Sequence, residues 1–158
     1  MKNFVKIFAV VLVIAMSVAM FAACVPSDPA KAEANLKEAG YKVIVTSSSS
    51  LGDILGDIGN DLLGDTVPKN VDKTVTATKD KELVSIVYFK DKDSAKTYYD
   101  ALKAEQTKVK EEVKKEFEAG KLTEAEYKEA QAEMKNTKLG KSGKVVWMGT
   151  KEGVKAAG

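Results

Sequence analysis

Residues 83–89 read Leu-Val-Ser-Ile-Val-Tyr-Phe, and the fold follows from this stretch. Every residue except Ser85 is apolar or aromatic, so an extended chain would bury side chains on both of its faces. The run is shorter than an ordinary helix, and its valines and isoleucine favour strands. We therefore expect a central strand with neighbours on both sides.

Three more stretches have the pattern of strands. Residues 42–46 place three β-branched residues in a row, which predicts a second central strand. Residues 71–78 alternate between a dry face of valine and alanine and a wet face of aspartate and threonine, which is typical of a strand near a sheet edge. Residues 145–148, Val-Val-Trp-Met, form the last predicted strand, after a turn at 140–143. Thr150 is expected to cap a short final helix.

The first predicted helix precedes all of these strands. It runs from Ala30 to Ala39, with Ser27 or Asp28 as its N-cap. Gly40 is placed to end it in the left-handed conformation.

A long, charged helical hairpin is predicted between Asp93 and Lys138. Its first helix has an apolar stripe at helical spacing, interrupted by Gln106. Thr123 and Glu126 form a capping box that begins the second helix. The hairpin is longer than a four-stranded sheet can cover, so its outer part either projects to meet a partner or is a solvated surface of intrahelical ion pairs.

The segment 51–65 combines a helical pattern with a poor helical composition. Its four glycines each cost about 1 kcal/mol of helix propensity relative to alanine. Its aspartates recur every four residues, which spreads them along a helix, so we expect a solvated face rather than a metal site. The other side is apolar, and we expect it either to dock on the domain's own sheet or to contact a protein partner or lipid. The residues available for that contact are Leu51, Ile54, Leu55, Ile58 and Leu62.

Together these elements predict an α+β fold. With a helix at 51–65, the order strand, helix, strand, strand, helices, strand is the split βαβ arrangement of ferredoxin-like folds. Its first and third strands are central, which agrees with the two stretches that are apolar on both faces. We therefore expect two layers, with an antiparallel four-stranded sheet and additional N-terminal, hairpin and C-terminal helices. The alternative leaves residues 51–65 as a disordered insertion.

The first 24 residues have the features of an export signal. Lys2 and Lys6 form a positive start, and no charge occurs in residues 7–25. The apolar run ends at residues 21–24, Phe-Ala-Ala-Cys, and Cys24 is the only cysteine in the chain. Small residues before a cysteine at this place resemble the lipobox of bacterial lipoproteins. The phenylalanine is a departure, because that family usually has leucine there.

The resemblance implies a modification, a boundary and a location. In that family the thiol receives a diacylglycerol group, the chain is cut before the cysteine, and the cysteine becomes the N-terminus. This implies a signal peptide at 1–23, a lipidated tether at 24–29 and a single domain at 30–158. The domain would be lipid-anchored on the extracytoplasmic face of the cell membrane, with the membrane as a partner through the lipid on Cys24. The alternatives are an uncleaved membrane anchor, a plain signal peptide and a structural cysteine.

Composition excludes several kinds of chemistry. The chain has no histidine, and all of its basic residues are lysines. The leader carries two of the 25 lysines and no acid, so residues 24–158 hold 23 lysines and 23 acidic residues. A neutral domain without arginine is not expected to bind nucleic acid. Ser-His, Cys-His and His-metal catalysis are excluded, and we expect no cofactor. With no second cysteine to form a disulfide, stability must come from the core.

The expected function is therefore binding rather than catalysis. We expect a lipoprotein that contacts a protein partner or an envelope component through residues 51–65 or the hairpin tip. One alternative is a small-ligand or cation-binding lipoprotein, with Trp147, Tyr98 and Tyr99 lining a groove, although large aromatic residues are more often core. Another is an enzyme that uses Asp, Glu or Lys, for which no spacing singles out a pair.

Overall fold

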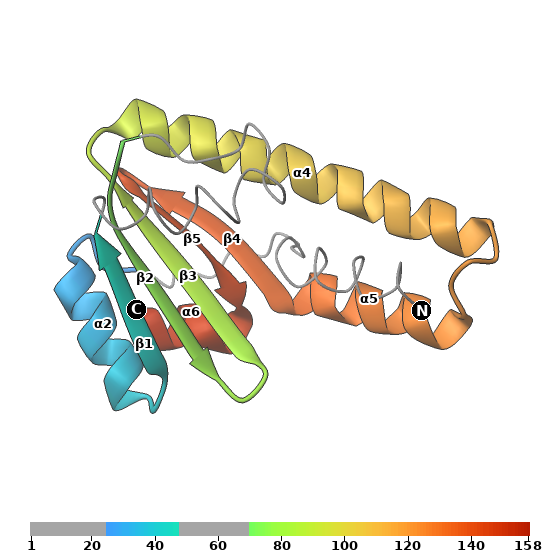
Figure 1. Ribbon diagram of the computed structural model, residues 1–158, viewed down its shortest axis with the longest axis horizontal. Helices are drawn as coiled ribbons and strands as arrows, with labels where there is room; N and C mark the ends of the chain where they lie inside the picture. Colours follow the sequence, from blue (N-terminus) through green and yellow to red (C-terminus); the bar gives the residue numbers. More distant parts are fainter. Residues whose placement is uncertain (1–24, 48–69) are drawn as a thin grey trace.

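The computed structural model describes residues 25–47 and 70–158. They form an α+β domain on one five-stranded antiparallel sheet, with strand order β1-β2-β3-β5-β4 (Figure 1). The strands are β1 (Lys42–Ser47), β2 (Val71–Lys79), β3 (Glu82–Phe89), β4 (Thr137–Ser142) and β5 (Val145–Thr150). The described helices are α2 (Pro29–Glu38), α4 (Lys92–Glu118), α5 (Glu124–Asn136) and α6 (Lys151–Ala157).

The sheet differs from the predicted four-stranded, ferredoxin-like arrangement. Residues 137–142 were expected to end a helix and begin a turn, but they form β4 and pair with the whole of β5. β3 is central, as expected, whereas β1 is an edge strand and β2 lies between them. Three consecutive β-branched residues favour a strand, but they do not show which strands lie beside it. The helix predicted at 51–65 lies outside the described residues.

Helices lie on both faces of the sheet, so the predicted two-layer arrangement is wrong. On one face α2 and α6 cover the strands, with Val75, Val84 and Ile86 fully buried. Ala32 and Leu36 of α2 and Val154 and Ala157 of α6 complete this part of the core. The apolar pattern of β3 on both faces requires cover on both sides, and this second layer of helices supplies it.

The long helix α4 covers the opposite face over β3, β4 and β5 (Figure 1). Its Ala95 and Leu102 are buried against Val87 and Val146 of the sheet. Beyond the sheet, α4 and α5 continue side by side as a hairpin (Figure 1). A separate cluster fills the space between them, made of Val109, Val113, Leu122 and Met134.

The predicted caps of α2 and the predicted start of α5 are confirmed. The Asp28 carboxylate caps α2 by accepting a hydrogen bond from the Ala30 N–H at 2.9 Å. Gly40 follows the helix with a φ of 82°, a conformation that glycine adopts without strain. At α5, the Thr123 hydroxyl accepts from the Glu126 N–H, and the Glu126 carboxylate accepts from the Thr123 N–H. These local bonds fix where each helix begins and ends.

Candidate functional site

The residues predicted to make contacts lie next to described parts of the chain. Cys24, Leu51, Ile54, Leu55, Ile58 and Leu62 are outside the described residues. Cys24 is bonded directly to Val25, and the chain that holds the other five leaves β1 at Ser47 and returns at Asn70. The described structure therefore shows the chain next to both groups of residues.

Val25, the residue after Cys24, is part of the folded core, whereas Ser27 and Asp28 are exposed. The Val25 side chain is only 5% exposed and packs with Leu36 and Tyr88. The Tyr88 hydroxyl donates a hydrogen bond to the Pro26 carbonyl oxygen at 3.1 Å. Burial, and to a lesser extent Asp28, raises the pKa of Tyr88 above its ordinary value, so this hydroxyl keeps its proton at neutral pH. The first described residue is thus held in place by both packing and a hydrogen bond.

One part of the sheet carries an exposed isoleucine. Ile44 of β1 is opposite Thr76 of β2, which is opposite Ser85 of β3, so the three side chains form a row on the face that carries α4. Contacts of α4 concentrate on β3, β4 and β5, and Ile44 is 68% exposed. Thr46 and Thr74 form the next row of this mostly polar surface.

Aromatic and apolar contacts join the two helices of the hairpin, and charged side chains cover its outer surface. The Phe117 and Tyr127 rings stack with their centroids 4.2 Å apart, next to Val113 and Leu122. On the outside, Lys114 pairs with Glu118 on α4 and Lys128 with Glu124 on α5. Each such exposed intrahelical pair contributes only about 0.2–0.5 kcal/mol.

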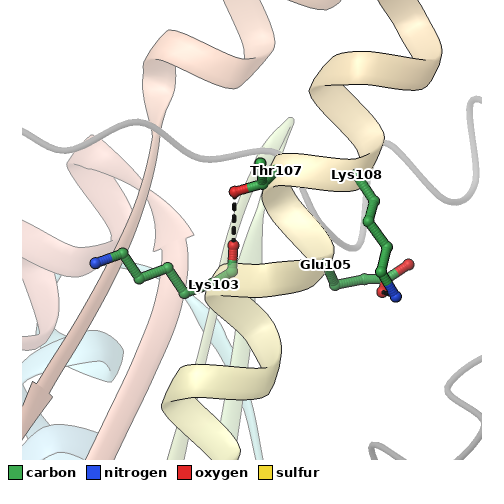
Figure 2. A network of polar contacts seen from close by, with 4 residues as sticks. All are labelled: Lys103, Glu105, Thr107 and Lys108. Carbon is green, nitrogen blue, oxygen red and sulfur yellow. Dashed lines mark hydrogen bonds and ion pairs between the residues drawn. The ribbon is translucent and has the colours of Figure 1, made fainter.

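Polar contacts midway along α4, at residues 103–108, are also internal to the helix. Figure 2 shows the Thr107 hydroxyl donating to the Lys103 carbonyl oxygen and the Lys108 ammonium beside the Glu105 carboxylate. The two atoms of the second pair are 3.1 Å apart. This pattern is that of a solvated helix surface, and it leaves both helices free to present mixed charges to a partner.

The aromatic residues proposed for a groove lie on opposite faces of the sheet. Trp147 packs on the side of α2 and α6, over Gly140 of β4. Tyr98 and Tyr99 belong to α4 and pack on the other side of the sheet. Burial raises the pKa of Tyr98 to about 12, and its ring packs against Phe89 with 5.5 Å between centroids. These three residues therefore do not line a common cavity.

Several titratable side chains of the described residues form hydrogen bonds at helix ends. Hydrogen bonds from Ser94 lower the pKa of Asp91 at the start of α4, and bonds from Thr123 lower that of Glu126. The Thr150 hydroxyl donates to the Glu82 carboxylate while it caps α6. In residues 25–47 and 70–158, no three His, Cys, Asp or Glu residues are grouped so as to hold a metal ion.

Comparison with known proteins adds no assignment. No family model, no curated protein and no solved structure matches this chain. Within the part of the chain that the structure describes, every helix is too short or too polar to cross a membrane. Any proposal about function therefore depends on the sequence of the leader and on the surfaces described above.

Proposed function

We propose that this protein is a lipoprotein anchored by a diacylglycerol thioether on Cys24, on the extracytoplasmic face of the cell membrane. The observation that supports it most is the burial of Val25. Val25, the residue after Cys24, is buried in the core, so cutting before Cys24 would remove the leader and keep Val25 in the chain. Two acyl chains suffice for stable anchoring, since each buried methylene contributes about 0.8 kcal/mol.

Mass spectrometry of the N-terminal peptide tests the anchor. We expect the purified membrane form to begin at Cys24 and to carry the added mass of a diacylglycerol group. A Cys24→Ser variant should lack that mass and keep the leader, whereas Ser27→Ala should be processed normally. An unmodified Cys24, or an N-terminus at another residue, would overturn the proposal.

We also propose that the anchored domain binds a protein partner or an envelope component without catalysing a reaction. The absence of histidine and arginine from the chain supports this, because it removes the common catalytic groups. Two surfaces are candidates for the contact: the segment 51–65 and the hairpin tip, residues 113–128. The small-ligand alternative has less support, because Trp147 and Tyr98 lie on opposite faces of the sheet.

Deletion and charge reversal distinguish the two candidate surfaces. If residues 51–63 make the contact, a protein that lacks them keeps its circular dichroism spectrum and loses a partner that crosslinks to the intact protein in envelope membranes. If the tip makes the contact, the double variant Lys121→Glu/Lys128→Glu loses the same partner. The matched control reverses two exposed lysines far from the tip, Lys31→Glu/Lys155→Glu. A deletion that unfolds the domain would show that residues 51–63 are part of the core.

A further inference from the structure

Hydrogen bonds connect the strand ends at the end of the sheet next to Val25. Four hydrogen bonds hold its strand ends together: Tyr88 hydroxyl to Pro26 oxygen, Phe89 N–H to Lys144 oxygen, Lys90 N–H to Asn70 oxygen, and Lys144 ammonium to Lys90 oxygen. Their donor–acceptor distances are 2.7–3.1 Å. We call this region the anchor end; it consists of Val25–Pro26, Tyr88–Lys90 and the β4–β5 turn with its flanks, Lys141–Val145.

No free linker separates the proposed lipid from the anchor end. Consecutive Cα atoms are 3.8 Å apart, so the Cys24 Cα lies one such step from a residue that is 5% exposed. Tyr88 is paired with Val145, and both pack in the same cluster as Val25. Neighbouring strands are about 4.8 Å apart, which places the β4–β5 turn beside the anchor rather than across the molecule.

The β4–β5 corner of the anchor end is cationic. Lys141 and Lys144 flank the turn, and no acidic residue occurs between Thr137 and Lys151. Lys90, whose carbonyl oxygen accepts a hydrogen bond from the Lys144 ammonium, adds a third exposed ammonium. Among the described residues at this end, the Asp28 and Asp91 carboxylates accept helix-cap hydrogen bonds, and Asp72 and Asp93 belong to β2 and α4 rather than to the turn. Clustered lysines next to a membrane favour anionic headgroups.

We propose that the anchor end rests on the membrane surface, with Lys90, Lys141 and Lys144 in contact with anionic lipid headgroups, so that the domain has one fixed orientation. This inference depends on the proposed acylation of Cys24. The helix α4 begins beside this end and its 27 residues span about 40 Å, so the hairpin tip is held away from the bilayer.

Site-specific quenching tests the orientation. The only native cysteine would be acylated, so an introduced cysteine is the single reactive thiol. We would attach a bimane label at Ser142→Cys in the β4–β5 turn, at Ala125→Cys in the hairpin tip, and at Lys81→Cys at the far end of the sheet; all three residues are exposed. The lipidated protein is placed in phosphatidylethanolamine–phosphatidylglycerol vesicles that contain nitroxide-headgroup lipid.

We expect nitroxide lipid to quench the label at residue 142 at least threefold more than the labels at 81 and 125. Inserting ten glycine and serine residues between Cys24 and Val25 should reduce that difference to near unity, because the restraint is lost. Equal quenching at 142 and 125, in protein whose acylation is confirmed by mass, would overturn the orientation. Protein without the acyl mass would instead overturn the proposed anchor.

The charge contribution has its own test. In the Ser142→Cys protein, Lys141→Gln/Lys144→Gln should reduce quenching at 142 at least twofold on anionic vesicles and leave it unchanged on phosphatidylcholine vesicles. Lys114→Gln/Lys128→Gln on the hairpin is the matched control and should have no effect on either. Unchanged quenching of the Lys141/Lys144 variant on anionic vesicles would overturn the headgroup contact.

Discussion

Ile44 and Ile86 differ in how far the rest of the protein buries their side chains. Both are isoleucines in strands of the same sheet, and both stand in β-branched runs of sequence. Ile86 is fully buried beneath α2 and α6, whereas Ile44 is 68% exposed at the edge. The free energy that an apolar side chain contributes depends on the area that it removes from water, so these two should contribute very differently.

We expect Ile86→Ala to lower the free energy of unfolding by about 2–5 kcal/mol, because it leaves a cavity in a closely packed core. The matched substitution Ile44→Ala should change it by less than about 0.5 kcal/mol. Urea unfolding followed by circular dichroism measures both. A large loss for Ile44→Ala would mean that another part of the chain or a second molecule covers β1 in solution.

At the scale of the element, α5 depends on its N-terminal cap. The Glu126 carboxylate accepts from both the N–H and the hydroxyl of Thr123 at 2.7 Å. These bonds lower the pKa of Glu126 below its ordinary value of 4.5. The unfolded chain therefore binds more protons than the folded one in acid, and the stabilisation is present above the ordinary pKa and disappears as pH falls through the lowered one.

Glu126→Gln should therefore lower the melting temperature at pH 7, and the difference from wild type should shrink as the pH falls through the lowered pKa of Glu126 and the carboxylate gains its proton. The hydrogen bond that the Thr123 hydroxyl accepts from the Glu126 N–H does not depend on the charge of Glu126. Thr123→Ala should therefore lower the free energy of unfolding by about 1 kcal/mol. Thermal melts by circular dichroism between pH 7 and pH 2.5 measure both effects. A melting-temperature difference between wild type and Glu126→Gln that stays constant over this range would contradict the assignment.

Elements with local signals could be predicted, and those that depend on distant contacts could not. Asp28, Gly40, Thr123 and Glu126 act within a few residues of themselves, and their roles follow from spacing alone. β4 has no such signal, because its sequence, Thr-Lys-Leu-Gly-Lys-Ser, has little preference for a strand. It forms because β5 supplies a hydrogen-bonded partner along its length. The contact of Tyr88 with Pro26 likewise joins residues 62 positions apart.

At the scale of the whole molecule, the core is divided into three clusters. Two lie on the faces of the sheet, and the third fills the hairpin beyond it. The hairpin cluster has only four buried members, so less apolar surface opposes its local opening. The hairpin should therefore open without the sheet.

We expect amides of residues 110–133 to exchange with deuterium faster than those of β3. Val113→Ala should speed exchange in the hairpin and leave β3 unchanged, because Val113 belongs only to the hairpin cluster. Val84→Ala, in the cluster of α2 and α6, is the control and should speed exchange in β3 but leave the hairpin unchanged, because the hairpin opens without the sheet. Equal acceleration of β3 by Val113→Ala would show that hairpin and sheet unfold as one unit.

The position of Val25 also implies an order of events during biogenesis. Proteolysis takes place on exposed, poorly ordered segments, so Val25 would have to be outside the core when the bond before Cys24 is cut. Its side chain would reach its place beside Leu36 and Tyr88 only after the leader has been removed. Maturation of the N-terminus would thus precede the last step of folding, and an unprocessed precursor would remain slightly open at this point.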